Sequence, residues 1–211
     1  MIARSMQRNG LILAAFAVVA TLLVMLTARL TAEPIAREQQ RELLQVLNQL
    51  IPAQAHDNDL YASCRLIEAP ELATGPTPMY LATQDGQPAA AAIEVVAPNG
   101  YSGGIRLLVA MNWDNTVAGV RVLQHQETPG LGDKIERRKS DWITSFEGMT
   151  VTGPDDQRWA VQRDGGVFDQ FTGATITPRA VVQAVARTVT AFKRNKDQWR
   201  QQTLECGGQS S

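Results

Sequence analysis

Two threonines that flank a small turn are the residues in this sequence best suited to chemistry. Residues 172–175 read Thr-Gly-Ala-Thr and precede Thr177, Pro178 and an apolar run. The segment has no lysine after its glycine, as a phosphate-binding loop would, and no serine between spaced glycines, as a nucleophile elbow would. Its two hydroxyls therefore fit neither of these catalytic signatures.

The residues after this turn predict the start of a helix. Thr177 is a suitable N-cap and Pro178 a suitable first helical residue. Such a helix directs free N–H groups and its positive dipole end back at the turn, where Gly173 and Ala174 let a phosphate approach the backbone closely. The pattern predicts an anion site, and the alternative is a capped turn without a ligand.

The elements that must position this turn are one helix and an antiparallel sheet. Apolar residues at helical spacing predict a helix after the turn, and segments that alternate or are rich in β-formers predict strands. Two turns, Asp85-Gly86 and Asp114-Asn115, join strands into a meander, so the class is α+β. The helix face comprises Val182, Val185, Val189 and Phe192, and the strand candidates are 61–69, 78–84, 90–98, 104–113 and 116–124.

Loops connect the meander to the threonine turn. Residues 125–136 form a glycine-rich loop, and Ser140 is placed to cap a short helix that begins at Asp141. Residues 152–166 are expected to supply a further turn and a short strand.

The N-terminal region predicts a membrane anchor. Residues 10–28 carry no charge, and as a helix they would be about 28 Å long, enough to cross the hydrocarbon core. Arg4 and Arg8 precede this span, which predicts a cytoplasmic N-terminus and a domain on the outer side. A cleaved signal peptide is the alternative, but its apolar region would be shorter.

The resulting organisation has four parts. Residues 1–8 are expected to be cytoplasmic, 9–30 to span the membrane, 31–52 to form a stalk helix and 53–211 to form the outer domain. The stalk is predicted from apolar residues at mostly three- and four-residue steps, namely Ile35, Leu43, Leu44, Leu47 and Leu50.

The charge, the cysteines and the histidines of the chain limit the kinds of site that it can contain. The formal net charge is −1, so no basic face for nucleic acid is expected, and the basic residues at 137–139 read as a solvated helix end. Cys64 and Cys206 are expected to pair on an oxidising side of a membrane, the alternative being two unrelated buried thiols. His125 beside Glu127 suggests a metal, but the chain has only one other histidine, so no metal site is expected.

The segment from Asp169 to Thr175 resembles a known attachment motif. It matches Asp-x-x-Ser/Thr-Gly-Ala-Thr, the flavinylation motif in which FMN is joined through its phosphate to the last threonine. Together with GYSGGIRLLVA, ETPGLGDKIE, SDWI and DQFTGATITPRAVV, this motif makes the chain similar to the G subunit of the bacterial Rnf electron-transport complex, the RnfG/RsxG family. The resemblance covers nearly the whole chain, including the anchor and both cysteine positions.

This resemblance implies a membrane-anchored flavoprotein of the inner membrane with its FMN-binding domain in the periplasm. The implied complex has six subunits and couples electron transfer between reduced ferredoxin and NAD to ion movement, and a separate FAD:protein FMN transferase makes the phosphoester. Thr175 would be the acceptor, Thr172 would shape the turn, and Asp169 would orient the acceptor or be read by the transferase. Such a protein carries electrons and turns over no substrate alone.

The resemblance also assigns flavin contacts to the glycine-rich loops. Leu131 would contact the ring, and Lys134 would neutralise phosphate or reduced-flavin charge. Tyr101 would lie near the flavin or pack under the loop, and Ser102 would donate to the phosphate. An ordinary surface hairpin loop is the alternative. The expected cofactor-binding residues are Thr172, Gly173, Ala174, Thr177, Glu127, Thr128, Leu131, Gly132, Lys134, Tyr101 and Ser102.

Two other functions fit parts of the same pattern. The C subunit of the sodium-pumping NADH:quinone reductase shares the threonine motif and the anchor, although chain length and the spacing of the loop segments favour the Rnf protein. A membrane-anchored module that binds an anion at the helix N-terminus without redox chemistry is the second.

Overall fold

A computed structural model describes residues 2–153 and 156–206, with side chains from residue 6 onward. The first residue of the expected cytoplasmic segment, the Arg4 side chain and the last five residues of the expected domain lie outside the described residues. The chain divides into two compact units, Met1–Gln45 and Val46–Ser211.

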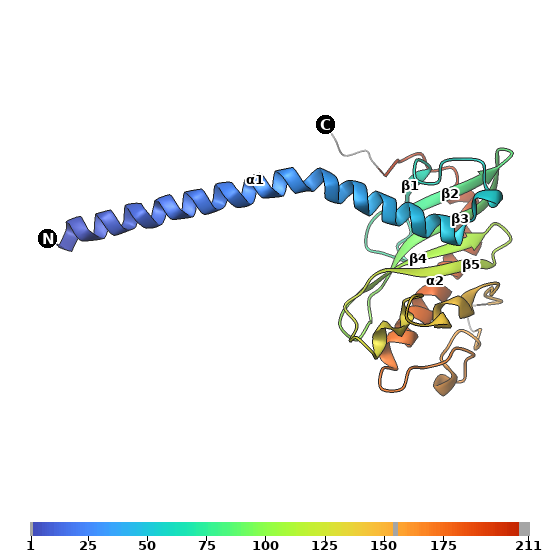
Figure 1. Cartoon of the computed structure of the whole chain (residues 1–211). Coiled ribbons are helices and arrows are strands. Elements are labelled where there is room, and N and C mark those ends of the chain that lie inside the picture. Colours follow the sequence, from blue (N-terminus) through green and yellow to red (C-terminus); the bar gives the residue numbers. More distant parts are fainter. Residues whose placement is uncertain (1, 154–155, 207–211) are drawn as a thin grey trace. The chain divides into compact units, whose positions relative to one another are not determined.

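The first helix, α1, runs without a break from Ile2 to Leu50 (Figure 1). The expected membrane span and stalk are therefore one continuous helix, which contains Pro34. It is the one helix in the described part of the chain long and apolar enough to cross a membrane, with a mean hydropathy of 2.7 in its most apolar window. The hydroxyls of Thr21 and Thr27 donate to carbonyls four residues earlier, which satisfies them in an apolar environment.

Five antiparallel strands form a meander in the order β1-β2-β3-β4-β5, as expected from the sequence (Figure 1). Asp85 and Gly86 both have positive φ, 51° and 73°, because the two-residue turn that suits the twist of a hairpin requires it. The strands are β1 (Cys64–Ile67), β2 (Thr77–Gln84), β3 (Gln87–Ala97), β4 (Ile105–Asn112) and β5 (Val117–Gln124).

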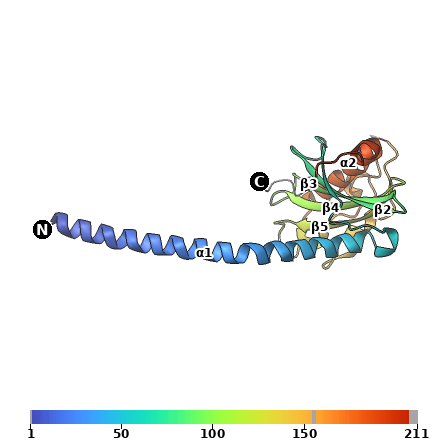
Figure 2. The same cartoon turned by 90° about the horizontal axis from the view of Figure 1, so that it is seen from above.

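The second long helix, α2 (Ile176–Trp199), covers one face of the sheet (Figure 2). Its expected apolar face is confirmed, because Val182, Val185, Val189 and Phe192 are all buried in the core. Residues that alternate along the strands complete this core, among them Met79, Leu81, Ile93, Val95, Leu107, Val109 and Met111.

The other face of the sheet meets the last turn of α1, which belongs to the second unit. Leu47, Leu50 and Ile51 are buried there. Gly119 lies against Leu50, since a Cβ atom at Gly119 would come within 2.7 Å of the leucine side chain. This glycine in β5 gives the helix its close approach to the sheet.

Short 3-10 helices and an aromatic cluster fill the segment between β5 and α2. Ser140 caps η3 (Asp141–Phe146) as expected, since its hydroxyl accepts from the Trp142 N–H at 3.1 Å. The other short helices are η1 (Ala53–Ala55), η2 (Gly132–Ile135) and η4 (Gln162–Asp164), and the clustered rings are Trp142, Phe146, Trp159, Phe168 and Phe171.

The short strand expected within 152–166 is wrong for the described residues of that segment. The chain instead makes a single bridge between Val161 and Phe168, followed by η4. The reason is a tight reversal, because a Cβ atom at Gly166 would come within 1.8 Å of the Ala160 carbonyl oxygen. So close a return leaves no room for an extended ladder.

A disulfide ties the C-terminal segment to the first strand. Cys64 and Cys206 are joined with their Cα atoms 5.5 Å apart, the pairing expected from the sequence. The Leu66 N–H donates to the Leu204 carbonyl at 2.7 Å. The segment thus lies along the free edge of β1.

Candidate functional site

The threonine segment forms a tight turn that leads directly into α2. The Ala174 N–H donates to the Phe171 carbonyl at 3.1 Å. Gly173 has a φ of +82°, which a side chain would strain. The turn therefore requires glycine at this position and places Thr175 at the helix start.

The expected N-cap was misplaced by two residues. Thr175, not Thr177, is the N-cap of α2, and its side chain makes no capping hydrogen bond. Thr177 is fully buried inside the first turn, and its hydroxyl donates to Glu127 Oε2. The hydroxyl is unavailable for capping because it satisfies a buried carboxylate.

This arrangement leaves the N-terminus of α2 without a side-chain cap. The N–H groups of a helix's first turn have no partner within the helix, and they carry its partial positive charge. Pro178 also lies in the first turn, where its missing N–H costs no helical bond. The backbone beside the Thr175 hydroxyl is therefore suited to receive an anion.

A pocket opens beside this helix start. Its volume is about 310 Å³, near the lower end of the range for small-molecule sites. Three apolar side chains line it while remaining exposed, Tyr101 by 67%, Leu131 by 42% and Ile176 by 45%. The lining residues are Tyr101, Glu127, Thr128, Leu131, Gly132, Gly173, Ala174, Thr175, Ile176 and Thr177.

Most of the residues expected at a cofactor site thus meet in one pocket, although they come from three separate segments. Ile176 is the lining residue that was not predicted from the sequence. The sequence could have indicated it. Ile176 is apolar, but its helical spacing places it off the buried face that includes Val185 and Val189. An apolar side chain at the start of a helix and off its buried face is exposed, and it is therefore a candidate for contact with a ligand.

Four expected site residues lie outside this lining. The Thr172 side chain is exposed, and Ser102 contributes its backbone N–H, which donates to Glu127 Oε1 at 3.0 Å. Lys134 and Asp169 instead line a separate, open depression of about 600 Å³ beside η3.

Asp169 makes its hydrogen bonds with residues outside the threonine turn. Its Oδ1 accepts from Gln162 Nε2 at 2.7 Å, and its carbonyl accepts from Trp142 Nε1 at 2.8 Å. No hydrogen bond links it to Thr175 among the described residues. Asp169 is nevertheless exposed.

Glu127 is the buried charged group of the pocket. It is 4% exposed, and its own N–H donates to His125 Nδ1 at 3.0 Å. His125 Nε2 lies 2.9 Å from Glu136 Oε1. The hydrogen bond from Arg138, and to a smaller extent that from His125, lowers the pKa of Glu136 below its usual value.

The described residues hold no group of three potential metal ligands.

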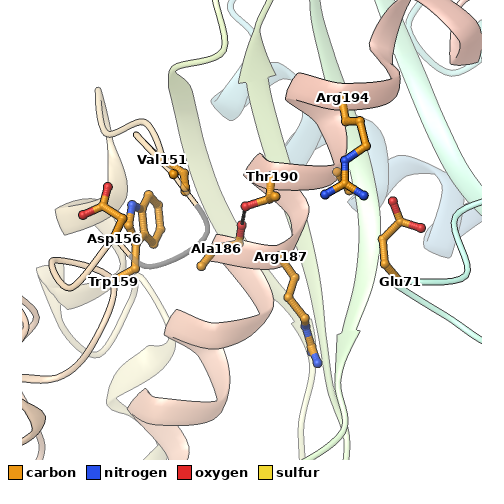
Figure 3. A pocket seen from close by; sticks show the side chains of 10 residues that line it. Glu71, Val151, Asp156, Trp159, Ala186, Arg187, Thr190 and Arg194 are labelled. Carbon is orange, nitrogen blue, oxygen red and sulfur yellow. Dashed lines mark hydrogen bonds between the residues drawn. The ribbon is translucent and has the colours of Figure 1, made fainter.

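A further hollow lies along α2, away from the threonine turn (Figure 3). It has a volume of about 270 Å³ and includes Arg187, Arg194 and Trp159. The Thr190 hydroxyl donates to the Ala186 carbonyl at 2.8 Å, as the dashed line in Figure 3 shows. None of the sequence-predicted site residues lines this hollow.

Comparisons with known families match two regions of the chain. Residues 100–190 match the model of the FMN-binding domain. Residues 1–50 match the model of the RnfG N-terminal region. The first match includes every residue that lines the candidate pocket.

Several known proteins are similar to this chain over most of its length. The G subunit of the ion-translocating oxidoreductase complex of Vibrio atlanticus strain LGP32 is 52% identical over 206 residues, 97% of this chain and 99% of that one. Its counterpart in Vibrio cholerae serotype O1 strain O395 is 53% identical over the same shares. The crystal structure of Shewanella oneidensis NqrC aligns with a TM-score of 0.47 and 22% identity, over 70% of this chain and 73% of that one.

Proposed function

The chain belongs to the family of G subunits of ion-translocating oxidoreductase complexes, and from that membership we propose that it is a membrane-anchored electron carrier of such a complex, with FMN attached covalently through Thr175. The observation that carries the proposal is the position of Thr175. Thr175 lines the pocket and is the N-cap of α2 without a side-chain capping bond, and it lies within the region matched by the FMN-binding domain model.

The residues around Thr175 fit a phosphate. The side chain is half-buried and makes no capping bond, so its oxygen is free for a phosphoester. The first turn of α2 offers N–H donors and a positive dipole end to the remaining phosphate oxygens. Gly173 leaves the approach open, because even a Cβ atom there would meet only Leu131, at 3.6 Å.

The rest of the pocket fits a planar ring. Tyr101, Leu131 and Ile176 offer exposed apolar surface that a flat apolar ligand would cover. Bound FMN supplies the capacity to accept and pass on electrons, which no side chain here supplies. The protein's part is to hold the ring against this surface and to exclude water from one of its sides.

Attachment requires an enzyme besides this chain. Thr175 has no neighbouring base among its described contacts, and an unactivated hydroxyl is a weak nucleophile. A FAD:protein FMN transferase would take the Thr175 proton, form the bond from the Thr175 oxygen to the FMN phosphorus and release AMP from FAD. The exposed Asp169 and Thr172 of the motif are the surface that such an enzyme would read.

The helix α1 supports a membrane location. We propose that it spans the inner membrane once, with the N-terminus in the cytoplasm and the FMN-binding domain in the periplasm, since basic residues precede the span. The other membrane and iron-sulfur subunits of the complex would then be its partners. Membership of the G-subunit family argues against the C subunit of the sodium-pumping quinone reductase.

Covalent flavin tests the proposal directly. In a host that makes the transferase, Thr175→Ala should abolish in-gel flavin fluorescence after denaturation, because it removes the bonded oxygen. Thr175→Val should do the same, since it keeps the side chain's volume but not the hydroxyl.

Thr172→Ala is the matched control within the motif. It should retain covalent flavin, with slower attachment at most, because Thr172 lies outside the pocket lining. Covalent flavin in denatured Thr175→Ala protein would show that another residue is the acceptor. A wild-type domain without flavin absorbance in the same host would favour an anion-binding module without redox chemistry.

A further inference from the structure

Glu127 is a buried carboxylate held by donors from two other segments of the pocket. The Ser102 N–H donates to Oε1 at 3.0 Å, and the Thr177 hydroxyl donates to Oε2. Burying a carboxylate is costly unless such bonds replace its water. The three segments are therefore coupled, since the carboxylate loses a donor if either neighbour moves away.

Two glycines enclose the same carboxylate. A Cβ atom at Gly100 would lie 2.9 Å from Oε1, and one at Gly132 would lie 2.9 Å from Oε2. Neither glycine has a positive φ, so lack of space, not backbone conformation, accounts for both. Glu127 shares this close contact with the Gly103 carbonyl oxygen, 2.3 Å from a Cβ atom at Gly100, and with the Thr177 hydroxyl, 2.9 Å from one at Gly132. The Glu127 backbone is fixed as well, through its N–H bond to His125.

We propose that Glu127 is the positioning residue of this pocket. Its carboxylate joins the segment carrying Tyr101, the loop carrying Leu131 and the helix start carrying Ile176, and it thereby sets the spacing of the three apolar contacts. This inference rests on the proposed function, in which these contacts hold the flavin ring. A carboxylate at the pocket wall also opposes the addition of electrons to a bound ring.

Replacing Glu127 by glutamine tests whether the carboxylate positions the pocket or whether the side chain only fills volume. The glutamine side chain would keep the size of the glutamate but offer only one acceptor oxygen, so its NH₂ group would face one of the two donors. Glu127→Gln full-length protein, co-expressed with the transferase, should keep covalent flavin because Thr175 is intact. Its visible circular dichroism should fall, because the ring is held less firmly, and its midpoint potential should rise, because a negative charge is removed from the pocket wall.

Thr177 provides the coupled test. Thr177→Val should lower the flavin circular dichroism as Glu127→Gln does, Thr177→Ser should restore it, and the double variant should lose no more than either single variant. Thr188→Val is the matched control, since Thr188 is a fully buried threonine of the same helix whose hydroxyl donates to the Ala184 carbonyl at 2.8 Å. It should leave the dichroism and the potential unchanged.

The outcomes distinguish this inference from the proposed function. Unchanged dichroism and potential in flavin-bearing Glu127→Gln, or additive losses in the double variant, would overturn the positioning role and leave the attachment proposal intact. If Glu127→Gln does not fold, an unchanged spectrum in Thr177→Val would overturn it equally. Wild-type protein without covalent flavin would remove the proposed function and this inference together.

Discussion

The backbone at Gly173 decides whether the threonine turn at residues 172–175 forms. Gly173 has a φ of +82° and a nearest side-chain neighbour at an ordinary contact distance of 3.6 Å. Gly173→Ala should therefore act through backbone strain and lower the free energy of unfolding by about 1 kcal/mol. Denaturant unfolding of the detergent-solubilised chain would measure this, with Gly75→Ala as the neutral control because Gly75 has open space and no positive φ.

Glu136 makes stability depend on pH. Its pKa is lowered from 4.5, first by the hydrogen bond from Arg138 and also by that from His125. A carboxyl with a depressed folded pKa contributes stability above its unfolded pKa, and this stability is lost as pH falls through the folded value. Unfolding free energies of wild type should therefore drop below about pH 4.5.

The Glu136→Gln variant isolates that contribution. It should show a smaller drop over the same acidic range, because glutamine does not titrate. Glu42→Gln, at an exposed position of α1, should retain the wild-type slope. If the unfolding free energies of wild type and Glu136→Gln fell equally with pH, other carboxylates would account for the acid sensitivity.

The roles of single residues were predictable where they depended on local sequence. Ser140 caps its short helix as its neighbours predict. Thr177 does not cap α2, because its hydroxyl is taken by Glu127, 50 residues away in sequence. A pattern of adjacent residues holds no information on so distant a partner. The meeting of Tyr101 and Leu131 in one pocket was expected from the family resemblance and not from local pattern.

At the scale of elements, the disulfide secures the C-terminal segment against β1. Cys64 and Cys206 are separated by 142 residues, so the bond constrains a long loop in the unfolded chain. Its reduction should lower the free energy of unfolding by about 2–4 kcal/mol. Unfolding with and without a reductant would test this, and the Cys64→Ser/Cys206→Ser variant should be insensitive to reductant.

Strands with a clear period and turn were predictable, whereas compact irregular segments were not. The alternation in β4 and the Asp85-Gly86 turn located the meander. The expected strand within 152–166 failed because Gly166 packs against the Ala160 backbone. That contact belongs to a backbone reversal, in which the Phe168 N–H donates to the Ala160 carbonyl at 3.2 Å, and short-range periodicity does not describe such a reversal.

For the whole molecule, the proposed topology makes the domain accessible from outside the cytoplasm. Protease added to intact spheroplasts should digest the FMN-binding domain, because the basic residues before the span keep the N-terminus inside. A cytoplasmic marker protein should survive in the same sample. Digestion of the domain only after lysis would reverse the orientation.

The pairing of the C-terminal segment with β1 also bears on self-association. An uncovered edge strand presents unpaired N–H and C=O groups on which another chain can add a strand. Here the Leu66 N–H is already satisfied by Leu204, and Arg65 forms a bridge with Glu205. The disulfide therefore also guards against edge-to-edge aggregation, so a reduced preparation should form oligomers rich in intermolecular β-structure well before the sheet itself unfolds.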